Sequence, residues 1–343
     1  MLQKKIIYST SKPSNKVQTT TYEAASSKYS AVLKGYYNDP FLKYFVQKVE
    51  SRSPLINRGY YSRVAALRQY IDLFFKSLDN AESIQLVNIG AGLDTIFFWT
   101  SERYKNVNYY ELDFHELLIE KTDIINNFEE LKHFLKYEET NINDKKETNG
   151  LIDCTNYKML PFNLNECGSI EQKLIDHNFN FSLPTLFLCE CVLIYLEIQS
   201  SDILINILSD IMKNTSCIIV YEQVNPDSAF GKIMIDNFNK RGLNLKSIYK
   251  YHNLDLQMQR FKSLGWTNVY VNDMNEIYDY HIDINEKKRI EKLEMFDELE
   301  EWRLLQNHYF ILVAFNCYNK LNLNELNTFL KNKKETKKKK CIM

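Results

Sequence analysis

Two glycines near one quarter of the chain length predict a ligand site. The stretch LVNIGAGLDTIFFWT, residues 86–100, places Gly90 and Gly92 directly after an apolar run, although the whole chain contains only nine glycines. A strand that ends at Ile89 and turns into a helix leaves the free N–H groups of that helix facing the crevice beyond the strand ends. Ligands bind in this crevice in open α/β sheets. We therefore expect a ligand to approach the backbone closely at this turn.

The turn departs from the pattern of a dinucleotide site. Such a site is typical of G-x-G-x-x-G, in which backbone amides approach a pyrophosphate and the third glycine allows close helix packing. Here the third position is Thr95, and Asp94 adds a negative charge near the start of the helix. This charge would repel phosphates, so the turn alone favours a ligand without a phosphate.

Carboxylates on later strands support that interpretation. The stretch VNYYELDF ends in Glu111 and Asp113, about 20 residues beyond the glycines, where an acid can hydrogen-bond a ribose diol. Glu190 follows an apolar run in LFLCECVLIYL, and a carboxylate there needs either a basic partner or a cationic ligand. S-adenosylmethionine has an ammonium and a sulfonium but no phosphate. The sequence therefore favours S-adenosylmethionine over NAD as the cofactor.

Short apolar runs alternate with helical patterns, as they do in repeated βα units. We expect strands at 84–89, 107–112, 184–189 and 216–224, a weaker one at 150–154, and a closing pair at 267–273 and 308–315. This order predicts an α/β fold of the methyltransferase (Rossmann-like) type, with a seven-stranded, mostly parallel sheet and helices on both faces. Apolar residues at helical spacing between 287 and 305 predict one amphipathic helix that covers the sheet.

One domain accounts for most of the chain. Residues 1–25 are polar and rich in Ser, Thr and Lys, and we expect a disordered arm there. Residues 26–320 should form a single domain with an N-terminal helical extension, and residues 321–343 a basic tail.

Composition excludes several classes of function. The net charge is −1, which gives no electrostatic case for nucleic acid, and the longest apolar run is too short to span a membrane and is broken by Glu190. Seven cysteines without CxxC pairs and six histidines without an HxxxH pair indicate neither a disulfide framework nor a metal site. We expect reduced thiols and a cytoplasmic protein.

Several longer stretches resemble the leucine carboxyl methyltransferase family, from about residue 28 to residue 315. They include SPLINRGYYSRV, VNIGAGLDTIFF, LPTLFLCECVLIYL and YEQVNPDSAFGKIMIDNF. The resemblance implies S-adenosylmethionine as methyl donor, S-adenosylhomocysteine as product, and the C-terminal leucine of the protein phosphatase 2A catalytic subunit as substrate. Relatives that share the glycine turn include small-molecule O-methyltransferases and a wybutosine-forming tRNA enzyme.

The resemblance also implies site residues. Gly90 would lie against the cofactor, Asp113 would bind its ribose, and Glu190 would receive its ammonium. The remaining implied residues are Lys28 and Arg63 at the methionyl carboxylate, Asp153 and Cys154 near the adenine, and Tyr195 with Arg63 in catalysis.

Each assignment has a structural alternative. Asp113 could cap the helix that begins near His115, Arg63 could be a surface charge, and Tyr195 could belong to the core. As a mechanism we expect Arg63 and Tyr195 to orient an already ionised carboxylate, without a general base or a covalent intermediate. The alternative functions are a methyltransferase of the same fold that acts on a small acid or a tRNA precursor, and a non-catalytic protein that binds the phosphatase.

Overall fold

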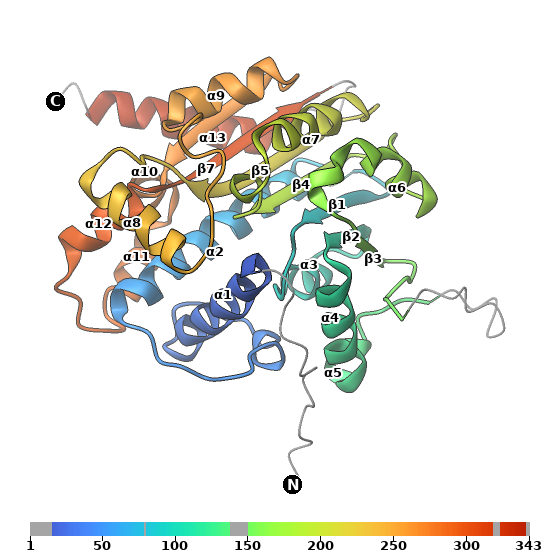
Figure 1. Cartoon of the computed structure of the whole chain (residues 1–343), viewed down its shortest axis with the longest axis horizontal. Helices are drawn as coiled ribbons and strands as arrows, with labels where there is room; N and C mark the ends of the chain where they lie inside the picture. Colours follow the sequence, from blue (N-terminus) through green and yellow to red (C-terminus); the bar gives the residue numbers. More distant parts are fainter. Residues whose placement is uncertain (1–15, 79, 138–149, 318–322, 341–343) are drawn as a thin grey trace, which may run out of the picture.

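The computed structural model describes residues 16–78, 80–137, 150–317 and 323–340. Within these ranges seven strands form one sheet, and helices cover both of its faces (Figure 1). The strands are β1 (Ile84–Ile89), β2 (Val107–Asp113), β3 (Tyr157–Pro161), β4 (Thr185–Glu190), β5 (Ser216–Gln223), β6 (Asn268–Asp273) and β7 (Tyr309–Asn316). The α-helices are α1 (Lys16–Leu33), α2 (Pro54–Lys76), α3 (Ile96–Arg103), α4 (His115–Asn127), α5 (Glu129–Lys132), α6 (Ile170–Asp176), α7 (Ile198–Asp210), α8 (Ala229–Lys240), α9 (Leu254–Ser263), α10 (Met274–Glu276), α11 (Ile284–Ile290), α12 (Leu299–Gln306) and α13 (Asn324–Lys340). Short turns of other helix types are η1 (Leu42–Tyr44), η2 (Leu164–Ser169), η3 (Leu193–Tyr195) and η4 (Ile277–His281).

The strand order is β3-β2-β1-β4-β5-β7-β6. Strands β1 to β5 are parallel, and β7 lies antiparallel between β5 and β6. The expected seven-stranded, mostly parallel α/β fold is confirmed, including the closing antiparallel pair. The order reverses between β1 and β4, and this switch point is where open sheets of this kind bind ligands.

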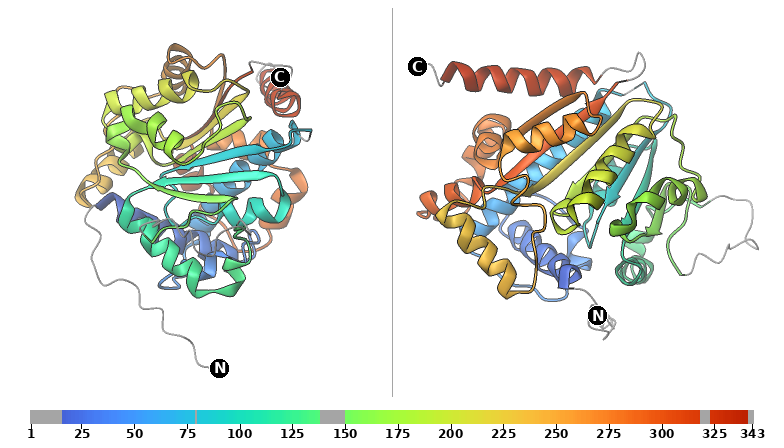
Figure 2. Two further views of the ribbon diagram at one scale, coloured as in Figure 1. Left: turned by 90° about the vertical axis from the view of Figure 1, so that its right-hand side faces the viewer. Right: turned by 45° about the horizontal axis from the view of Figure 1, so that its top comes forward.

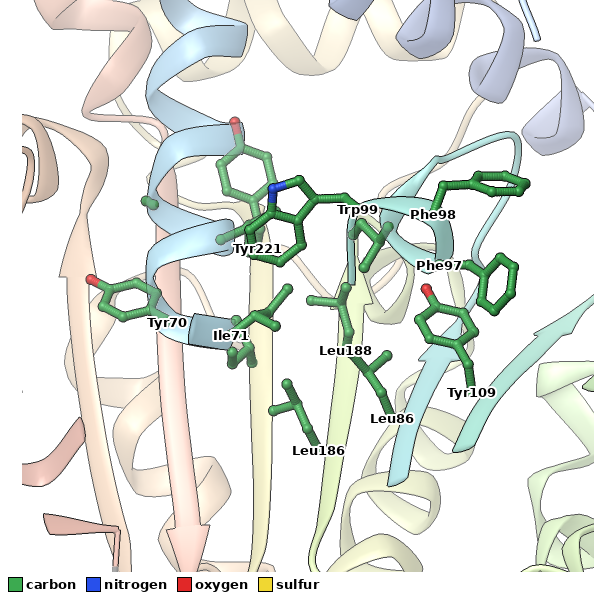
Figure 3. Close-up of a cluster of buried hydrophobic side chains, with 14 of the residues drawn as sticks. Tyr70, Ile71, Leu86, Phe97, Phe98, Trp99, Tyr109, Leu186, Leu188 and Tyr221 are labelled. Atoms are coloured by element: carbon green, nitrogen blue, oxygen red, sulfur yellow. The ribbon is translucent and has the colours of Figure 1, made fainter. Parts of the chain in front are cut away.

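Each face of the sheet carries its own apolar core. On one face Leu86, Leu188 and Tyr221 of the strands pack against Ile71 of α2 and Phe97 of α3 (Figure 3). On the other face strand residues pack against α6, α7 and α9. The central strands are therefore buried on both sides, which explains their nearly continuous apolar sequences. Figure 2 shows the helices layered on the two sides of the twisted sheet.

Helices occupy part of the predicted arm and part of the predicted basic tail. Residues 16–25, expected to belong to a disordered arm, are part of α1, whose Gln18 and Ala25 are buried. The helix packs on α2, so its polar composition does not reflect disorder. In the expected basic tail, Leu326 and Leu330 of α13 are buried against the domain. Residues 1–15, 318–322 and 341–343 lie outside the described residues, and the domain limits 26 and 320 stay predictions.

The third strand lies later in the chain than the sequence predicted. Residues 150–154 were expected to form it, but β3 occupies Tyr157–Pro161, and Asp153 forms only an isolated bridge with Lys158. The ring of Tyr157 stacks on Phe97 with centroids 3.9 Å apart, so aromatic packing fixes the strand at its observed position.

The expected single helix over 287–305 is two helices. Helix α11 ends at Ile290, α12 begins at Leu299, and Met295 between them is 90% exposed. The apolar residues recur every third position, so in a continuous helix each would rotate by about 60° from the previous one. The break allows both Ile290 and Trp302 to reach the core, where neither has exposed surface.

Candidate functional site

A cleft of about 470 Å³ opens at the carboxyl ends of the central strands. The cleft is lined by the glycine turn after β1, the end of β2, the segment after β4 and the end of β5. Residues of α1 line it as well. Six of the eight predicted site residues line this cleft, namely Lys28, Arg63, Gly90, Asp113, Glu190 and Tyr195. Sheet topology therefore brings together residues that are widely separated in the sequence.

The glycine turn has a backbone that only glycine adopts readily. Gly90 and Gly92 have φ angles of +68° and +55°, in the left-handed region. A Cβ atom on Gly90 would lie 2.5 Å from Val192 Cγ2, and one on Gly92 would collide with Thr21 of α1. Glycine at these two positions thus leaves room for Val192 and for Thr21 of α1, which lie directly against the turn.

Asp113 joins the end of β2 to this turn. Its Oδ2 accepts the N–H of Gly92 at 2.8 Å, and its Oδ1 accepts the N–H of Phe114 at 2.7 Å. Burial raises the pKa of Asp113, and these backbone donors oppose the increase. Helix α4 has Phe114 at its N-cap, so Asp113 is not the cap. Asp113 lines the cleft, where its oxygens can accept hydrogen bonds from a diol.

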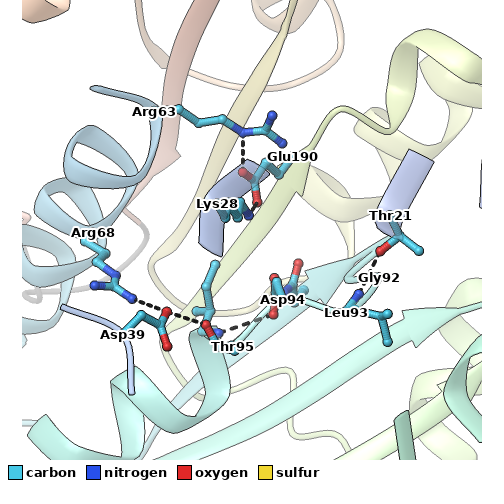
Figure 4. Close-up of polar contacts among 12 residues, drawn as sticks. Thr21, Lys28, Asp39, Arg63, Arg68, Gly92, Leu93, Asp94, Thr95 and Glu190 are labelled. Atoms are coloured by element: carbon cyan, nitrogen blue, oxygen red, sulfur yellow. Dashed lines mark hydrogen bonds and ion pairs between the residues drawn. The ribbon is translucent and has the colours of Figure 1, made fainter. Parts of the chain in front are cut away.

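Glu190 lies between two cations. Its Oε2 accepts from Lys28 Nζ at 3.0 Å, and its Oε1 pairs with Arg63 Nε (Figure 4). Burial alone would raise the pKa of Glu190, but the charges of Arg63 and Lys28 outweigh that effect and lower the pKa to about 2. The carboxylate is therefore ionised at neutral pH. A group that presents both signs of charge is suited to the ammonium and carboxylate of an amino acid.

Arg63 is not a surface charge. Its side chain is 11% exposed, and its guanidinium lies 4.5 Å from the ring centroid of Tyr221. Burial would lower its pKa, but Glu190 and the neighbouring acidic groups raise it well above the usual value. Tyr195, at the end of η3, lines the same cleft, and burial raises the pKa of its hydroxyl.

The negative charge of Asp94 is balanced by the buried cation Lys121. It accepts from Asn88 Nδ2 at 2.6 Å and lies 3.7 Å from Lys121 Nζ, whose side chain has no exposed surface. Lys121 also pairs with Glu111 at 2.8 Å. Burial raises the pKa of Asp94, and Lys121 opposes that rise. The charge that the sequence suggested at the turn is thus part of a buried network.

Asp153 and Cys154 are not among the residues that line the cleft. Asp153 pairs with Lys158 at 2.6 Å, and the Cys154 thiol is held near the Tyr157 carbonyl oxygen at 3.3 Å. The cleft is lined instead by residues after the end of β3, namely Phe162, Leu164 and Asn165. The third strand was predicted at 150–154, before its observed position, so residues too early in the chain were predicted to reach the cleft. The signal that would have found these residues is the apolar run YKMLP, whose end marks the carboxyl edge of the sheet.

Sequence reasoning also missed residues on β5. Gln223 ends β5 in the cleft, and the adjacent Glu222 accepts the N–H groups of Val192 and Ile194 at 3.2 and 3.0 Å. Burial raises the pKa of Glu222 to about 7. These contacts hold the segment between Glu190 and Tyr195 in place. The YEQVN motif, residues 221–225, is the part of the sequence that could have indicated Glu222 and Gln223.

The residues present fit S-adenosylmethionine. The glycine turn lines the cleft, Asp113 offers acceptors for a ribose, and the Lys28–Glu190–Arg63 group offers both charges for an amino acid. Across the described ranges, no group of three His, Cys, Asp or Glu side chains could hold a metal ion. None of the described helices is long and apolar enough to cross a membrane.

Known proteins resemble the chain over most of its length. A homologue of leucine carboxyl methyltransferase 1 from Arabidopsis thaliana is 38% identical over 88% of this chain and 89% of the relative. Leucine carboxyl methyltransferase 1 of Schizosaccharomyces pombe is 34% identical over 90% of this chain and 97% of the relative. The human tRNA wybutosine-synthesizing protein 4 is 33% identical over 87% of this chain, which spans 44% of that protein. A solved structure of a putative methyltransferase from Thermobifida fusca matches 84% of this chain and 93% of its own, with 12% identity and a TM-score of 0.48.

The family model for leucine carboxyl methyltransferases matches residues 16–209. Together with full-length relatives above 30% identity, this match confirms the family that the motifs indicated. The protein is a methyltransferase, as the sequence predicted. The chain belongs to the leucine carboxyl methyltransferase family.

Proposed function

We propose that the protein methylates the C-terminal leucine carboxylate of the protein phosphatase 2A catalytic subunit. The observation that carries the proposal is the buried Lys28–Glu190–Arg63 group, which faces a cleft large enough for a cofactor and the end of a peptide. The names of the two full-length relatives support the leucine carboxylate, and the motif resemblance supports the phosphatase.

The cofactor would occupy the inner part of the cleft. We infer that Gly90 lies against it, Asp113 binds the ribose, and Glu190 receives the ammonium while Lys28 and Arg63 hold the methionyl carboxylate. Phe162, Leu164 and Asn165, which follow β3, replace Asp153 and Cys154 as the proposed surroundings of the adenine.

The substrate carboxylate would lie beyond the Lys28–Glu190–Arg63 group, against Arg63 and Tyr195. A bound S-adenosylmethionine supplies a methyl carbon made electrophilic by its sulfonium. One carboxylate oxygen forms the new bond to that carbon, the carbon–sulfur bond breaks with its electrons left on sulfur, and no proton moves. Arg63 and Tyr195 need only hold the oxygen about 3 Å from the methyl carbon and in line with the sulfur. No general base is required, because the carboxylate is already ionised at neutral pH.

A labelling assay tests this function. Labelled S-adenosylmethionine is incubated with the protein and either intact phosphatase or phosphatase that lacks its last leucine. We expect base-labile label on the intact phosphatase alone. Label that persists on the truncated form would refute the proposal, and label on a small acid or tRNA precursor instead would favour the alternative substrates. Binding of phosphatase without any label would favour the non-catalytic alternative.

A cytoplasmic location is part of the proposal. In the described part of the chain the cysteines are free, including the buried Cys189 and Cys217, as is usual in a reducing compartment. Fluorescence microscopy of the tagged chain tests this location, and an extracellular signal would contradict it.

A further inference from the structure

The side chain of Gln223 carries a buried acceptor without a donor. Gln223 is the last residue of β5, is 3% exposed, and lines the cleft. Among the described residues no donor reaches its Oε1. Buried polar atoms are nearly always hydrogen-bonded, so such an atom in a ligand cleft indicates a contact that a ligand completes.

The surrounding residues fix the orientation of the amide. Its Nε2 is directed at Cys191 Sγ at 4.0 Å. Gln223 also lies opposite Tyr309 in the β5–β7 ladder, and its amide lowers the pKa of the Tyr309 hydroxyl that burial raises. The amide nitrogen therefore faces Cys191, and the amide oxygen is the atom left without a partner beside the cleft.

Gln223 lies at the end of β5, one strand farther from the glycine turn than Glu190 of β4. Strand β4 separates β5 from β1 and its glycine turn. Arg63 covers Tyr221, two residues before Gln223 on the same strand, and Tyr60, Tyr195 and Tyr309 line the cleft around this end. These neighbours surround the place where Arg63 and Tyr195 would hold the substrate carboxylate, away from the ribose acceptor Asp113.

The unpaired Gln223 Oε1 requires a ligand that donates a hydrogen bond. A carbonyl oxygen accepts hydrogen bonds only, and an ionised substrate carboxylate has no hydrogen to donate. The nearest donor on a protein C-terminus is the backbone N–H of its last residue. We propose that Gln223 Oε1 accepts a hydrogen bond from this amide N–H, so that the site recognises a carboxylate joined to a peptide bond. This inference rests on the proposed function and names the substrate feature that the site reads.

The contact predicts discrimination between substrates. A carboxylic acid without an adjacent N–H would leave Gln223 Oε1 unpaired in the complex as well. Sites built around a buried hydrogen-bonding group reject analogues that lack its partner. Simple aliphatic acids should therefore be poor substrates even where their size fits.

A single-atom replacement in the substrate tests the contact. Phosphatase catalytic subunit is prepared by ligation with its last residue as leucine, joined by an amide, or as 2-hydroxy-4-methylpentanoate, joined by an ester that lacks the N–H. For the natural enzyme we expect kcat/KM to fall roughly tenfold or more with the ester. For Gln223→Leu we expect a reduced kcat/KM with the amide and less than about a threefold further loss with the ester.

Controls separate the possible failures. Gln257→Leu removes a buried glutamine of α9 whose Nε2 bonds the Tyr251 carbonyl oxygen, and it should keep the full ester effect. Equal rates for amide and ester with the natural enzyme would overturn the inference while leaving the proposed function intact, and this comparison requires no variant to fold. Absence of methylation on the amide-linked phosphatase would overturn the proposed function and the inference with it. A Gln223→Leu variant that keeps the ester effect but binds S-adenosylhomocysteine more weakly would overturn the inference in favour of a cofactor contact.

Discussion

Arg63 of α2 and Glu190 at the end of β4 form a buried ion pair across 127 positions of sequence. Lys28 of α1 completes the group from a third element. The pair ties the N-terminal helices to the sheet at the point where the proposed substrate and cofactor would meet. The pair is thus both a packing contact and part of the proposed reaction site. Variants of Arg63 must therefore distinguish a loss of stability from a loss of activity.

Replacing Arg63 should abolish methylation. For Arg63→Ala we expect kcat/KM to fall at least about a hundredfold, because no planar fork remains to orient the carboxylate. Arg63→Lys keeps the charge beside Glu190, so the fold should be retained while activity still falls. The matched control is Arg103→Ala on the outer surface of α3, where the side chain is 43% exposed. Steady-state kinetics with circular dichroism checks this, and an unchanged kcat/KM in Arg63→Ala would remove Arg63 from the mechanism.

An alanine in the glycine turn should weaken cofactor binding. In Gly90→Ala the new Cβ would collide with Val192 at a φ of +68° that disfavours alanine. We expect calorimetry to show roughly tenfold weaker binding of S-adenosylhomocysteine. Gly168→Ala is the control, because a Cβ atom at that position would have no neighbour within 4 Å. Equal affinities in the two variants would show that the turn is not a cofactor contact.

Lys121 should be essential for stability. It has no exposed surface and serves both Glu111 and Asp94, so Lys121→Met leaves two buried carboxylates without their cation. We expect a loss of about 3–5 kcal/mol in the free energy of unfolding, measured with urea. Adding Glu111→Gln should restore part of it. Lys132→Met, which breaks an exposed pair with Glu129, should cost less than about 1 kcal/mol. Comparable losses in Lys121→Met and Lys132→Met would contradict the assignment.

Glu222 should make stability decrease as the pH rises. Burial raises its pKa in the folded protein to about 7 from the ordinary value of 4.5, so the folded state holds this proton more tightly than the unfolded chain does. Linkage then lowers the free energy of unfolding between about pH 4.5 and 7. Glu222→Gln cannot ionise, and its Oε1 can still accept from Val192 and Ile194.

Urea unfolding between about pH 5 and 8 measures this effect. The natural protein should lose more stability across the range than Glu222→Gln. The variant should keep some decline, because burial also raises the pKa of Glu111 to about 7. Parallel stability curves for the two proteins would show that Glu222 does not titrate in this range.

Helix α1 should control release of the cofactor product. Glu23 of α1 pairs with Arg241 after α8, and both residues line the cleft. The pair is about half exposed, so Glu23→Ala should change the free energy of unfolding by less than about 1 kcal/mol. We expect S-adenosylhomocysteine to dissociate several-fold faster in stopped-flow measurements, since α1 then closes the cleft less firmly. Glu129→Ala, which breaks another surface pair, is the control, and equal dissociation rates would exclude this role for α1.

The sequence by itself determined the sheet and the main residues of the cleft. Apolar runs placed six of the seven strands. In the central strands burial on both faces leaves a continuous signal in the sequence, whereas the edge strand β6 is mostly only partly buried. The glycines, Asp113 and Glu190 were found for the same reason, since each lies at or just beyond the carboxyl end of a recognisable strand. Where the strand was predicted too early, as at β3, the residues predicted beside it, Asp153 and Cys154, do not line the cleft.

Only the tertiary structure decided which partners these residues have. Nothing local links Lys28 and Arg63 to Glu190, Lys121 to Asp94, or Thr21 to the glycine turn; the sheet order and the packing of α1 bring them together. The unpaired Oε1 of Gln223 likewise exists only because β5 and β7 bury it beside the cleft. Pairing and burial depend on contacts between distant segments, which the spacing of residues along one chain does not specify.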